Sequence, residues 1–508
     1  MTRQDLTRVE VSLHKHANDA WIIINGDVWD VTGFAETHPG GEDVVEEHHG
    51  KDASEVYNSV HGPKLAMSYF GETKLIGRVP ELFRAQDQQA LENPKLIKSP
   101  PPLDSIINLQ DFEDAARSCL NERSWVYVSG ASNDCYTVSK NAEMYQSVFL
   151  RPRVCRPISQ VDTSTTVLGH RFDVPIFNAP ASLAMLTHPS AEVGLAKGLS
   201  ASGSTIIMPT LASYSLGEVV EALPQNHPFF FQLYIPRDSL ALAKLLDEIR
   251  RASPKAVMVT VDLPVFSKRE ANERYEMRMA KEKGESKNKK QTKQSRAASA
   301  AINPDVTWAQ IQTIKEKLGI PIFVKGIQCA EDAIKALESG CEGIYISNHG
   351  GRGVDTSQPA LLTLAEINMK CPQLLPRMSV FIDGGIRRGT DVFKAICLGA
   401  HGVCLGRPFF YALMYGEDGV RHLMNILRDE LENVMQLCGI QRLSEAHPGL
   451  LNTKALVTMV DTGELLKMGS KLLCMTVTNV RKNYIQVSCM HIDTPKKRHT
   501  PSSPHIRA

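Results

Sequence analysis

Eight short β-rich runs recur between residues 176 and 408 of this 508-residue chain, and this repetition constrains the fold more than any other feature. Each run ends in polar or glycine-rich residues, and most gaps hold one amphipathic helical stretch, such as 191–202 or 331–339. Alternating strands and helices predict a parallel sheet, and eight repeats predict an α/β fold of the (β/α)8 or TIM barrel type. The expected strands are 176–180, 205–209, 229–234, 256–262, 320–326, 343–350, 380–385 and 402–408.

The chain before the barrel is predicted to form a separate small module. Residues 84–102 are polar, end in prolines and lack apolar periodicity, as an interdomain linker does. Upstream, WIIINGDVWDVTGF predicts a β-hairpin around Asn25-Gly26-Asp27, with helical stretches from Glu42 and Ala53. The expected division is an N-terminal α+β domain (1–80), a linker (81–103), the barrel domain (104–462) and a tail (463–508) with no assigned function.

Composition limits the partners of the chain. Lys plus Arg number 57 against 56 for Asp plus Glu, so no net charge indicates a nucleic-acid partner. No apolar run reaches the roughly 18 residues of a membrane span, and the first residues resemble neither a secretory signal nor a transit peptide. The eleven cysteines form no C-x-x-C pair, which favours reduced thiols. We therefore expect small-molecule or protein partners and a cytoplasmic location.

The longest gap between expected strands follows the fourth. Residues 280–301 are rich in lysine and almost free of large apolar side chains, which predicts a disordered excursion. A lid, or a docking surface for an acidic partner, is the alternative.

Polar residues at the ends of the expected strands predict the active site, because chemistry in these barrels gathers at the carboxyl ends of strands. Backbone N–H groups of the turns near Gly385 and Gly406, with Arg387 and Arg407, predict a phosphate cradle after strands seven and eight. The other polar ends are Gln232-Leu233-Tyr234, Thr260-Val261-Asp262, Lys325, Ser347-Asn348-His349-Gly350-Gly351-Arg352 and Asp383-Gly384-Gly385.

Two histidines of the N-terminal module are candidate iron ligands. His38 opens a His-Pro-Gly-Gly turn and His61 follows 23 residues later, so two neutral imidazoles could bind an iron axially. A histidine before a turn is more often structural. VWDVTGFAETHPGGEDVV and GKDASEVYNSVHGP, however, resemble the cytochrome b5 family over residues 9–79, which implies haem b held by this pair. The histidines expected at the surface are His14, His16, His48 and His49.

The barrel motifs SNHGGRGVD, FIDGGIRRGTDVFKAICLGAHGVCLGRPF, FFFQLY and TVDLP resemble the FMN-dependent 2-hydroxy-acid oxidising family over about residues 104–439. That family contains glycolate oxidase and flavocytochrome b2, and the haem module in front makes the chain similar to the flavocytochrome b2 type. The resemblance implies FMN and haem b, an L-2-hydroxy acid substrate such as lactate, a cytochrome c-like acceptor and a homo-oligomer, by resemblance a tetramer. It also allows a mitochondrial intermembrane location.

The resemblance implies a role for individual side chains. His349 is the expected base, oriented by Asp262, and Lys325 is expected beside the N1 and O2 edge of the flavin. The substrate contacts it implies are Tyr127, Tyr234, Arg269, His349 and Arg352. The cofactor contacts it implies are Ala181, Ser182, Gln232, Thr260, Lys325, Asp383, Gly385, Arg387, Gly406 and Arg407.

Two departures from the family pattern alter the predicted substrate pocket. Pro209 stands where the family usually has a serine, and Ala181-Ser182 stand where relatives carry a Thr-Ala pair. The sequence therefore indicates oxidation of a 2-hydroxy acid without fixing which one. Two alternatives stay open: an oxidase that uses oxygen, with secondary metabolism as one setting, and a haem electron-transfer protein with an inactive barrel. The intact acid and base residues argue against the second.

Overall fold

The N-terminal domain is built on a five-stranded sheet of order β1-β5-β4-β3-β2 in the computed structural model, which describes residues 4–80, 96–282 and 302–460. Strand β3 (Asp19–Ile24) pairs antiparallel with β4 (Asp27–Asp30) across Asn25 and Gly26, which have φ of 53° and 83°. Positive φ at both central residues is the geometry of a type I′ turn. The predicted hairpin is therefore confirmed.

Short helices complete this domain close to the predicted positions. Helix α2 spans Glu42–Glu46, α3 spans Ser54–Asn58, and α4 spans Leu65–Phe70. The remaining strands are β1 (Gln4–Asp5), β2 (Lys15–His16) and β5 (Leu75–Arg78). One expectation is wrong: His49 is buried, with 8% of its surface exposed. The turn after α2 returns the chain to β3, where Gly50 N donates to Trp21 O at 2.7 Å, and this carries His49 inward.

The second half of the chain forms eight parallel strands in the order β10-β11-β12-β13-β14-β15-β16-β9, so the predicted barrel is confirmed. Each observed strand lies within or within one residue of its expected range. The strands are β9 (Ile176–Asn178), β10 (Ile207–Pro209), β11 (Phe230–Leu233), β12 (Ala256–Thr260), β13 (Ile322–Ile327), β14 (Gly343–Ile346), β15 (Ser379–Ile382) and β16 (Gly402–Leu405).

A side-chain amide bridges the first and second strands of the barrel. Asn178 Nδ2 donates to Ile207 O at 3.0 Å, and Ile207 N donates to Asn178 Oδ1 at 2.8 Å. The amide therefore reproduces both halves of a backbone ladder pair where β9 and β10 meet. Buried backbone groups need such partners, and Asn178 supplies both of those that Ile207 needs on the side facing β9.

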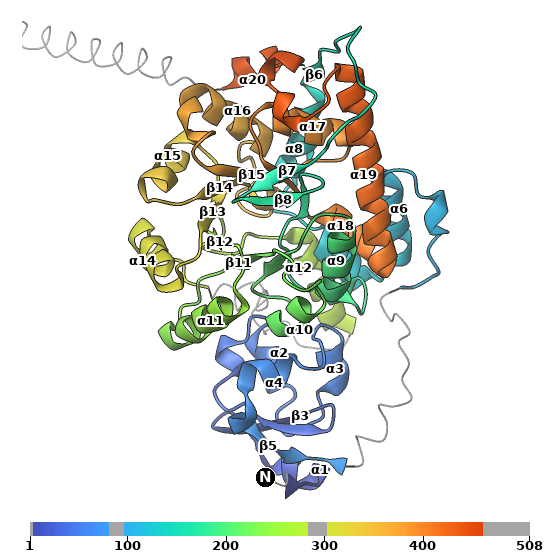
Figure 1. The fold of residues 1–508 in the computed structure, drawn as a ribbon. Coiled ribbons are helices and arrows are strands. Elements are labelled where there is room, and N and C mark those ends of the chain that lie inside the picture. The colour runs from blue at the N-terminus through green and yellow to red at the C-terminus, as the bar shows by residue number, and fades with distance from the viewer. Residues whose placement is uncertain (1–3, 81–95, 283–301, 461–508) are drawn as a thin grey trace, which may run out of the picture. The chain divides into compact units, whose positions relative to one another are not determined.

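Aromatic side chains fill the barrel. The rings of Phe230 and Phe323 meet that of Phe381 edge-to-face, with centroids 5.9 Å and 5.5 Å apart. Helices surround the strands, and Figure 1 shows α14 (Trp308–Leu318) and α15 (Ala330–Glu338) outside β13 and β14. The other helices of the wall are α9 (Ala191–Ala201), α10 (Leu216–Glu221), α11 (Ser239–Ala252), α16 (Ala360–Lys370), α17 (Gly389–Cys397), α18 (Arg407–Leu413) and α19 (Gly416–Cys438).

Three helices precede the barrel and hold the end of the predicted linker. They are α6 (Leu109–Cys119), α7 (Glu122–Ser129) and α8 (Tyr136–Gln146). Residues 96–102 are held at two points: Ile97 N donates to Cys119 O on α6 at 2.7 Å, and Pro101 O accepts at 3.0 Å from Tyr415 Oη, which lies between α18 and α19. Residues 96–102, the last part of the expected linker, are therefore hydrogen-bonded to the barrel domain.

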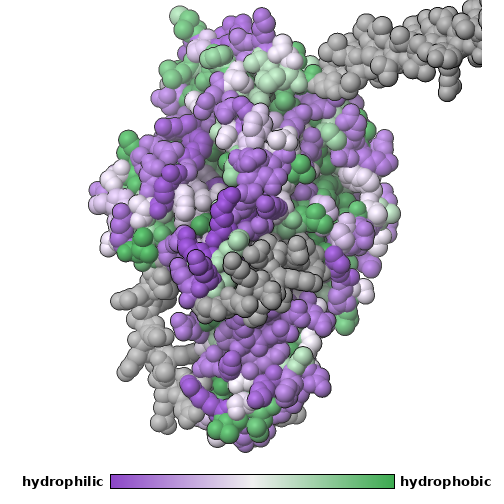
Figure 2. Space-filling view, turned by 180° about the vertical axis from the view of Figure 1, so that it is seen from behind, coloured by the Kyte–Doolittle hydropathy of each residue, from purple (hydrophilic) through white to green (hydrophobic). Residues whose placement is uncertain are grey.

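Three predicted segments fall largely outside the described residues: most of the linker, the tail, and the lysine-rich excursion beyond Glu282, where helix α12 (Glu270–Glu282) ends. Within the described ranges, no helix is both long and apolar enough to cross a membrane. Figure 2 shows hydrophilic and hydrophobic residues interspersed over the face that it draws.

Candidate active site

A histidine and an aspartate pair at the carboxyl ends of β12 and β14. His349 Nδ1 lies 2.9 Å from Asp262 Oδ1, and the side chain of Asp262 is fully buried. Burial lowers the pKa of His349 more than the nearby carboxylate raises it, so the imidazole is neutral at neutral pH. Burial alone would raise the pKa of Asp262, but Lys325 and His349 lower it, so the carboxylate stays charged. Nδ1 then donates to the carboxylate, and Nε2 is left as the basic nitrogen.

The backbone at His349 is held in an uncommon conformation. Its φ is 59°, and Gly350 and Gly351 also have positive φ. Such a conformation in a non-glycine residue persists only where its surroundings impose it, and it is typical of functional sites. Ser347 Oγ accepts from His349 N at 2.9 Å, and Asn348 exchanges amide hydrogen bonds of 2.8 and 2.9 Å with Asn141 on α8.

Two guanidinium groups flank this pair without an acidic partner. Arg352 Nη2 donates to Tyr127 O at 3.1 Å, and its guanidinium carbon lies 5.2 Å from the Tyr127 ring centroid. Arg269 Nε is buried without a hydrogen-bond partner among the described residues. Burial, then repulsion from Arg352, lowers the pKa of Arg269 to about 9, so it remains charged at neutral pH. No ion pair to either arginine occurs within the described ranges, which leaves both available to an anion.

Two tyrosines line the same site. Tyr234 Oη lies 3.4 Å from His349 Nε2, and Tyr127 Oη donates to Ser182 O at 3.2 Å. Burial, then the charge of Asp262, raises the pKa of Tyr234 far above its usual value, so this hydroxyl stays protonated. The structure therefore brings together every residue predicted to contact the substrate.

The residues predicted to face the flavin also share the carboxyl ends of their strands. Gln232 Nε2 donates to Thr260 Oγ1 at 3.0 Å. Lys325 Nζ is buried and lies 3.9 Å from Oδ2 of both Asp262 and Asp383. Asp383 Oδ1 is buried without a partner among the described residues. These groups fit FMN: a cation for the pyrimidine edge, amide and hydroxyl groups for the ring, and a carboxylate for ribityl hydroxyls.

The loops after β9 and β10 carry the two departures from the family pattern. Ala181 and Ser182 follow β9 and are partly exposed, while Leu183 has φ of 62°. Pro209 is the last residue of β10. The next residue, Thr210, does not replace the missing donor, because its N donates to Gln232 Oε1 at 3.2 Å and its Oγ1 donates to Gln232 O at 2.6 Å.

The predicted phosphate cradle is only partly open. The N–H groups of Arg387 and Arg388 donate to Asp391 Oδ2 at 3.0 and 3.1 Å, so these two are occupied by the cap of α17. The Arg387 guanidinium pairs with Glu113 Oε2 at 2.7 Å. Arg407 donates to two backbone carbonyl groups, but its Nε is buried without a partner among the described residues. Arg407, at the start of α18 after Gly406, is thus better placed for a phosphate than Arg387.

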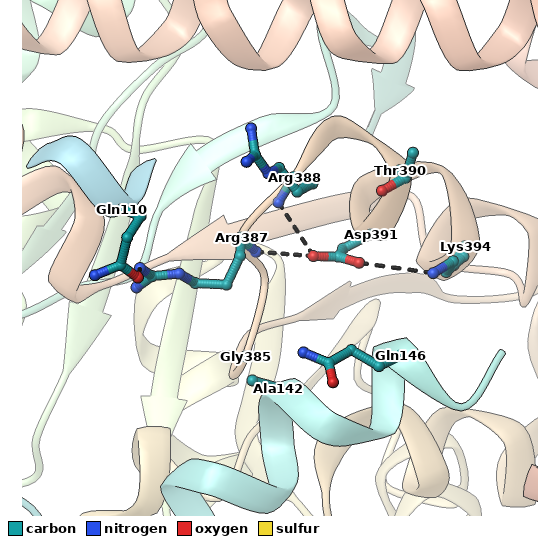
Figure 3. A pocket seen from close by; sticks show the side chains of 9 residues that line it. All are labelled: Gln110, Ala142, Gln146, Gly385, Arg387, Arg388, Thr390, Asp391 and Lys394. Atoms are coloured by element: carbon teal, nitrogen blue, oxygen red, sulfur yellow. Dashed lines mark hydrogen bonds and ion pairs between the residues drawn. The ribbon is translucent and has the colours of Figure 1, made fainter. Parts of the chain in front are cut away.

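A cavity of about 400 Å³ lies beside this cradle (Figure 3). Two charged groups of its lining already have partners within the protein. Lys394 Nζ lies 3.9 Å from Asp391 Oδ1 and donates to Tyr145 O at 2.9 Å. It shares two residues with the predicted cradle. The lining residues are Gln110, Ala142, Gln146, Gly385, Arg387, Arg388, Thr390, Asp391 and Lys394.

The two predicted haem ligands face each other in the N-terminal domain. The ring centroids of His38 and His61 are 6.2 Å apart, and two imidazoles that share one metal at about 2 Å from each nitrogen have centroids roughly 6 Å apart. His38 Nδ1 lies 3.1 Å from Gly41 O, to which it can only donate, so Nε2 is free to bind iron. Burial lowers the pKa of both rings, for His61 to about 4, which favours the neutral, ligating form.

The two glycines of the His-Pro-Gly-Gly turn are required by the local structure of the turn. A Cβ on Gly40 would lie 2.6 Å from His38 Cε1, and Gly41 has φ of 109°. Glycine at position 40 therefore leaves room for the His38 ring, and glycine at position 41 allows the positive φ.

Sequence reasoning missed several supporting residues. Ser347 was quoted within the strand-end run but given no role, although it also accepts from Lys325 Nζ at 3.2 Å. Asn141 and Glu113 lie on helices before the barrel, and no local pattern marked them. Their partners are about 200 or more residues away in sequence, so only the fold reveals these contacts.

Comparison with known proteins gives two family matches. Residues 116–453 match the FMN-dependent dehydrogenase family, and residues 7–80 match the cytochrome b5-like haem/steroid binding domain. L-lactate dehydrogenase (cytochrome) of Saccharomyces cerevisiae is 37% identical, over 90% of this chain and 81% of its own length. A peroxisomal (S)-2-hydroxy-acid oxidase of Oryza sativa is 34% identical, over 67% of this chain and 94% of its own. The solved structure of a flavocytochrome b2 mutant with pyruvate bound is similar, with a TM-score of 0.65 and 35% sequence identity. The match covers 79% of this chain and 96% of the chain in that structure.

Proposed function

The chain belongs to the FMN-dependent dehydrogenase family, with a cytochrome b5-like domain before the barrel, and we propose that it oxidises an L-2-hydroxy acid to the 2-keto acid. In this function, electrons pass from FMN to haem b and then to a carrier such as cytochrome c. Relatives named as L-lactate dehydrogenase (cytochrome) match about nine tenths of the chain, whereas the hydroxy-acid oxidases match about two thirds, which favours the cytochrome-linked function.

One observation carries the proposal: two charged guanidinium groups without an acidic partner among the described residues stand beside a neutral histidine paired with a buried carboxylate. A 2-hydroxy carboxylate supplies an anion for the guanidinium groups and a proton donor for the histidine. Its carboxylate binds Arg352 and Arg269, and its hydroxyl carbon then lies at His349. An uncharged alcohol would leave the guanidinium groups unpaired in a buried site, which is costly.

The chain's own residues position the substrate and move a proton. Arg352, Arg269 and Tyr127 hold the substrate carboxylate, and Tyr234 donates to or accepts from its hydroxyl. His349 Nε2 takes one of the two protons released when the alcohol becomes a carbonyl, and Asp262, 2.9 Å from Nδ1, stabilises the imidazolium that forms. When bound, FMN would supply the acceptor for the two electrons and for the second proton. Gln232, Thr260 and Lys325 hold its ring, and Asp383, Gly385, Arg387, Gly406 and Arg407 its ribityl phosphate.

The deciding experiment is a panel of 2-hydroxy acids added to the purified protein without oxygen, with flavin bleaching and haem reduction followed by stopped flow. We expect bleaching by L-2-hydroxy acids, followed by haem reduction. Peroxide formed at the rate of substrate oxidation, with the haem left oxidised, would instead identify an oxidase. A protein that holds haem but no flavin would be an electron-transfer protein.

Replacing the proposed base tests the assignment of His349. We expect His349→Gln to keep FMN bound but to slow flavin bleaching at least about 100-fold, as loss of a general base does. His188→Gln, at a half-buried histidine before α9, is the matched control and should bleach normally. Near-normal bleaching in His349→Gln would place the base elsewhere.

We also propose the wider organisation of the protein. The haem domain is residues 1–80, joined by residues 81–103 to the barrel domain at 104–462, with a tail at 463–508. The protein is a homo-oligomer that acts in the cytoplasm or the mitochondrial intermembrane space. Light scattering on the purified protein and cell fractionation test these two points.

A further inference from the structure

A tyrosine hydroxyl lies inside the barrel, beneath the predicted flavin site. Tyr345 on β14 is completely buried, and its ring belongs to the interior cluster that includes Phe323 and Phe381. Its backbone pairs in register with Lys325 on one side and with Phe381 on the other. Tyr345 is therefore a direct neighbour of Lys325, and it lies beside the strand that leads to Asp383.

The ring of Tyr345 supports the Lys325 ammonium group. Lys325 Nζ lies 4.9 Å from the ring centroid, a distance at which a cation is attracted to the face of an aromatic ring. Two carboxylates, Asp262 and Asp383, each lie 3.9 Å from the same nitrogen. The position of the ammonium group thus depends on a balance between two anions and one ring.

The hydroxyl of Tyr345 faces the second of these anions. Tyr345 Oη and Asp383 Oδ1 are both buried, and neither has a hydrogen bond of ordinary geometry among the described residues. Burial, then the charge of Asp383 and the Cys404 thiol, raises the pKa of Tyr345 well above its usual value. The group therefore remains a neutral O–H, whose hydrogen can turn toward the carboxylate.

We propose that Tyr345 is a positioning residue, which holds the Lys325 ammonium and the Asp383 carboxylate beneath the flavin and so sets how strongly the site favours anionic reduced flavin. The inference rests on the proposed FMN function. Without the hydroxyl, the charge of Asp383 is less shielded and draws Lys325 away from the flavin edge. Without the ring, Lys325 also loses its support. A tyrosine that only fills the barrel would instead be replaceable by phenylalanine with no electronic effect.

Sulfite binding to the FMN-loaded protein measures this effect without turnover. Sulfite adds to oxidised flavin at N5 and leaves negative charge on the pyrimidine edge, so its Kd reports the positive charge there. For Tyr345→Phe we expect sulfite binding roughly threefold to tenfold weaker, with FMN content and Tm unchanged; tenfold in Kd corresponds to about 1.4 kcal/mol. Tyr345→Leu should weaken sulfite binding further, because it removes the ring as well.

Thr205→Val is the matched control, since Thr205 Oγ1 is also buried without a partner but lies before the amino end of β10. This variant should keep the wild-type sulfite Kd. An unchanged Kd in a flavin-loaded Tyr345→Phe protein would overturn the inference and leave the proposed function intact. A wild-type protein that holds no flavin would overturn the proposed function itself. If Tyr345→Leu fails to hold FMN, Tyr345→Phe decides the question.

Discussion

His349 owes its position and its basicity to different neighbours. Ser347 and the strained turn of Gly350 and Gly351 fix its backbone, while Asp262 fixes the ring and its tautomer. Burial and the positive charge of Lys325 oppose protonation of the ring. The result is a base that is neutral before the reaction and has a carboxylate ready to stabilise its charged form.

This balance predicts the pH dependence of catalysis. Because the pKa of His349 lies below its usual value of about 6.5, the imidazole is in its basic form throughout neutral pH. We expect kcat/KM, which reports the free enzyme, to stay level down to about pH 6.5 and to fall only below it. In Asp262→Asn the acid limb should move to still lower pH, since the carboxylate that raises the pKa is gone. An acid limb centred above pH 7 would contradict this assignment.

Ser182 predicts the substrate preference. It follows β9, its backbone O accepts from Tyr127 Oη at 3.2 Å, and the family pattern has an alanine at this position. A hydroxyl that faces an apolar methyl without a partner costs about 1 to 3 kcal/mol, roughly tenfold or more in relative specificity. We expect larger or more polar 2-hydroxy acids to compete well with L-lactate, and Ser182→Ala to shift kcat/KM toward lactate. A wide lead for lactate in the wild type, unchanged by Ser182→Ala, would refute the pocket argument.

At the residue scale, the sequence and its family resemblance predict the reactive side chains and the pairing of His349 with Asp262, but not the other partners. His349, Arg352 and Lys325 are recognisable because each belongs to a polar run at or near the carboxyl end of a strand, where barrels gather polar groups. The N–H groups after Gly385 were expected to be free for phosphate, yet Asp391 accepts from two of them. A residue inside the next helix can cap its own start, and the turn sequence alone does not reveal this.

At the scale of elements, the barrel strands are predictable because they are buried on both faces and so form continuous apolar runs. The first and last residues of these strands are harder to predict. The expected strand at 205–209 begins at Ile207, because Ser204 donates to Ile176 O and Ile207 pairs with the side chain of Asn178, not with a backbone. A side chain that replaces a ladder pair leaves no periodic signal.

Asn178 therefore carries a prediction for the stability of the barrel. Asn178→Ala removes both hydrogen bonds to Ile207 and leaves a buried N–H and C=O unpaired, at a cost of at least about 2 kcal/mol. We expect a lower midpoint for thermal unfolding followed by release of flavin fluorescence. Asn178→Asp keeps the acceptor but loses the donor, so it should fall between wild type and Asn178→Ala. Equal midpoints for all three proteins would show that the seam is held elsewhere.

At the scale of the whole molecule, the two redox sites draw on separate parts of the sequence. Both proposed haem ligands lie in residues matched by the cytochrome b5-like domain, and every proposed flavin and substrate contact lies in residues matched by the FMN-dependent dehydrogenase family. Each domain also has an interior cluster of its own. A change at one site should therefore leave the chemistry of the other intact.

His61→Ala tests this separation. The variant loses one of two imidazoles whose centroids are 6.2 Å apart, so it should lose the low-spin haem spectrum. Flavin bleaching by a 2-hydroxy acid should continue at close to the wild-type rate, because His349, Asp262 and Arg352 are untouched, while reduction of added cytochrome c by the same substrate should stop. His16→Ala changes an exposed histidine of the same domain and should leave all three readouts unchanged. If His61→Ala kept its low-spin haem, the axial pair would be misassigned; if it lost the haem yet still reduced cytochrome c, electrons would leave the flavin directly and the haem would not be the relay.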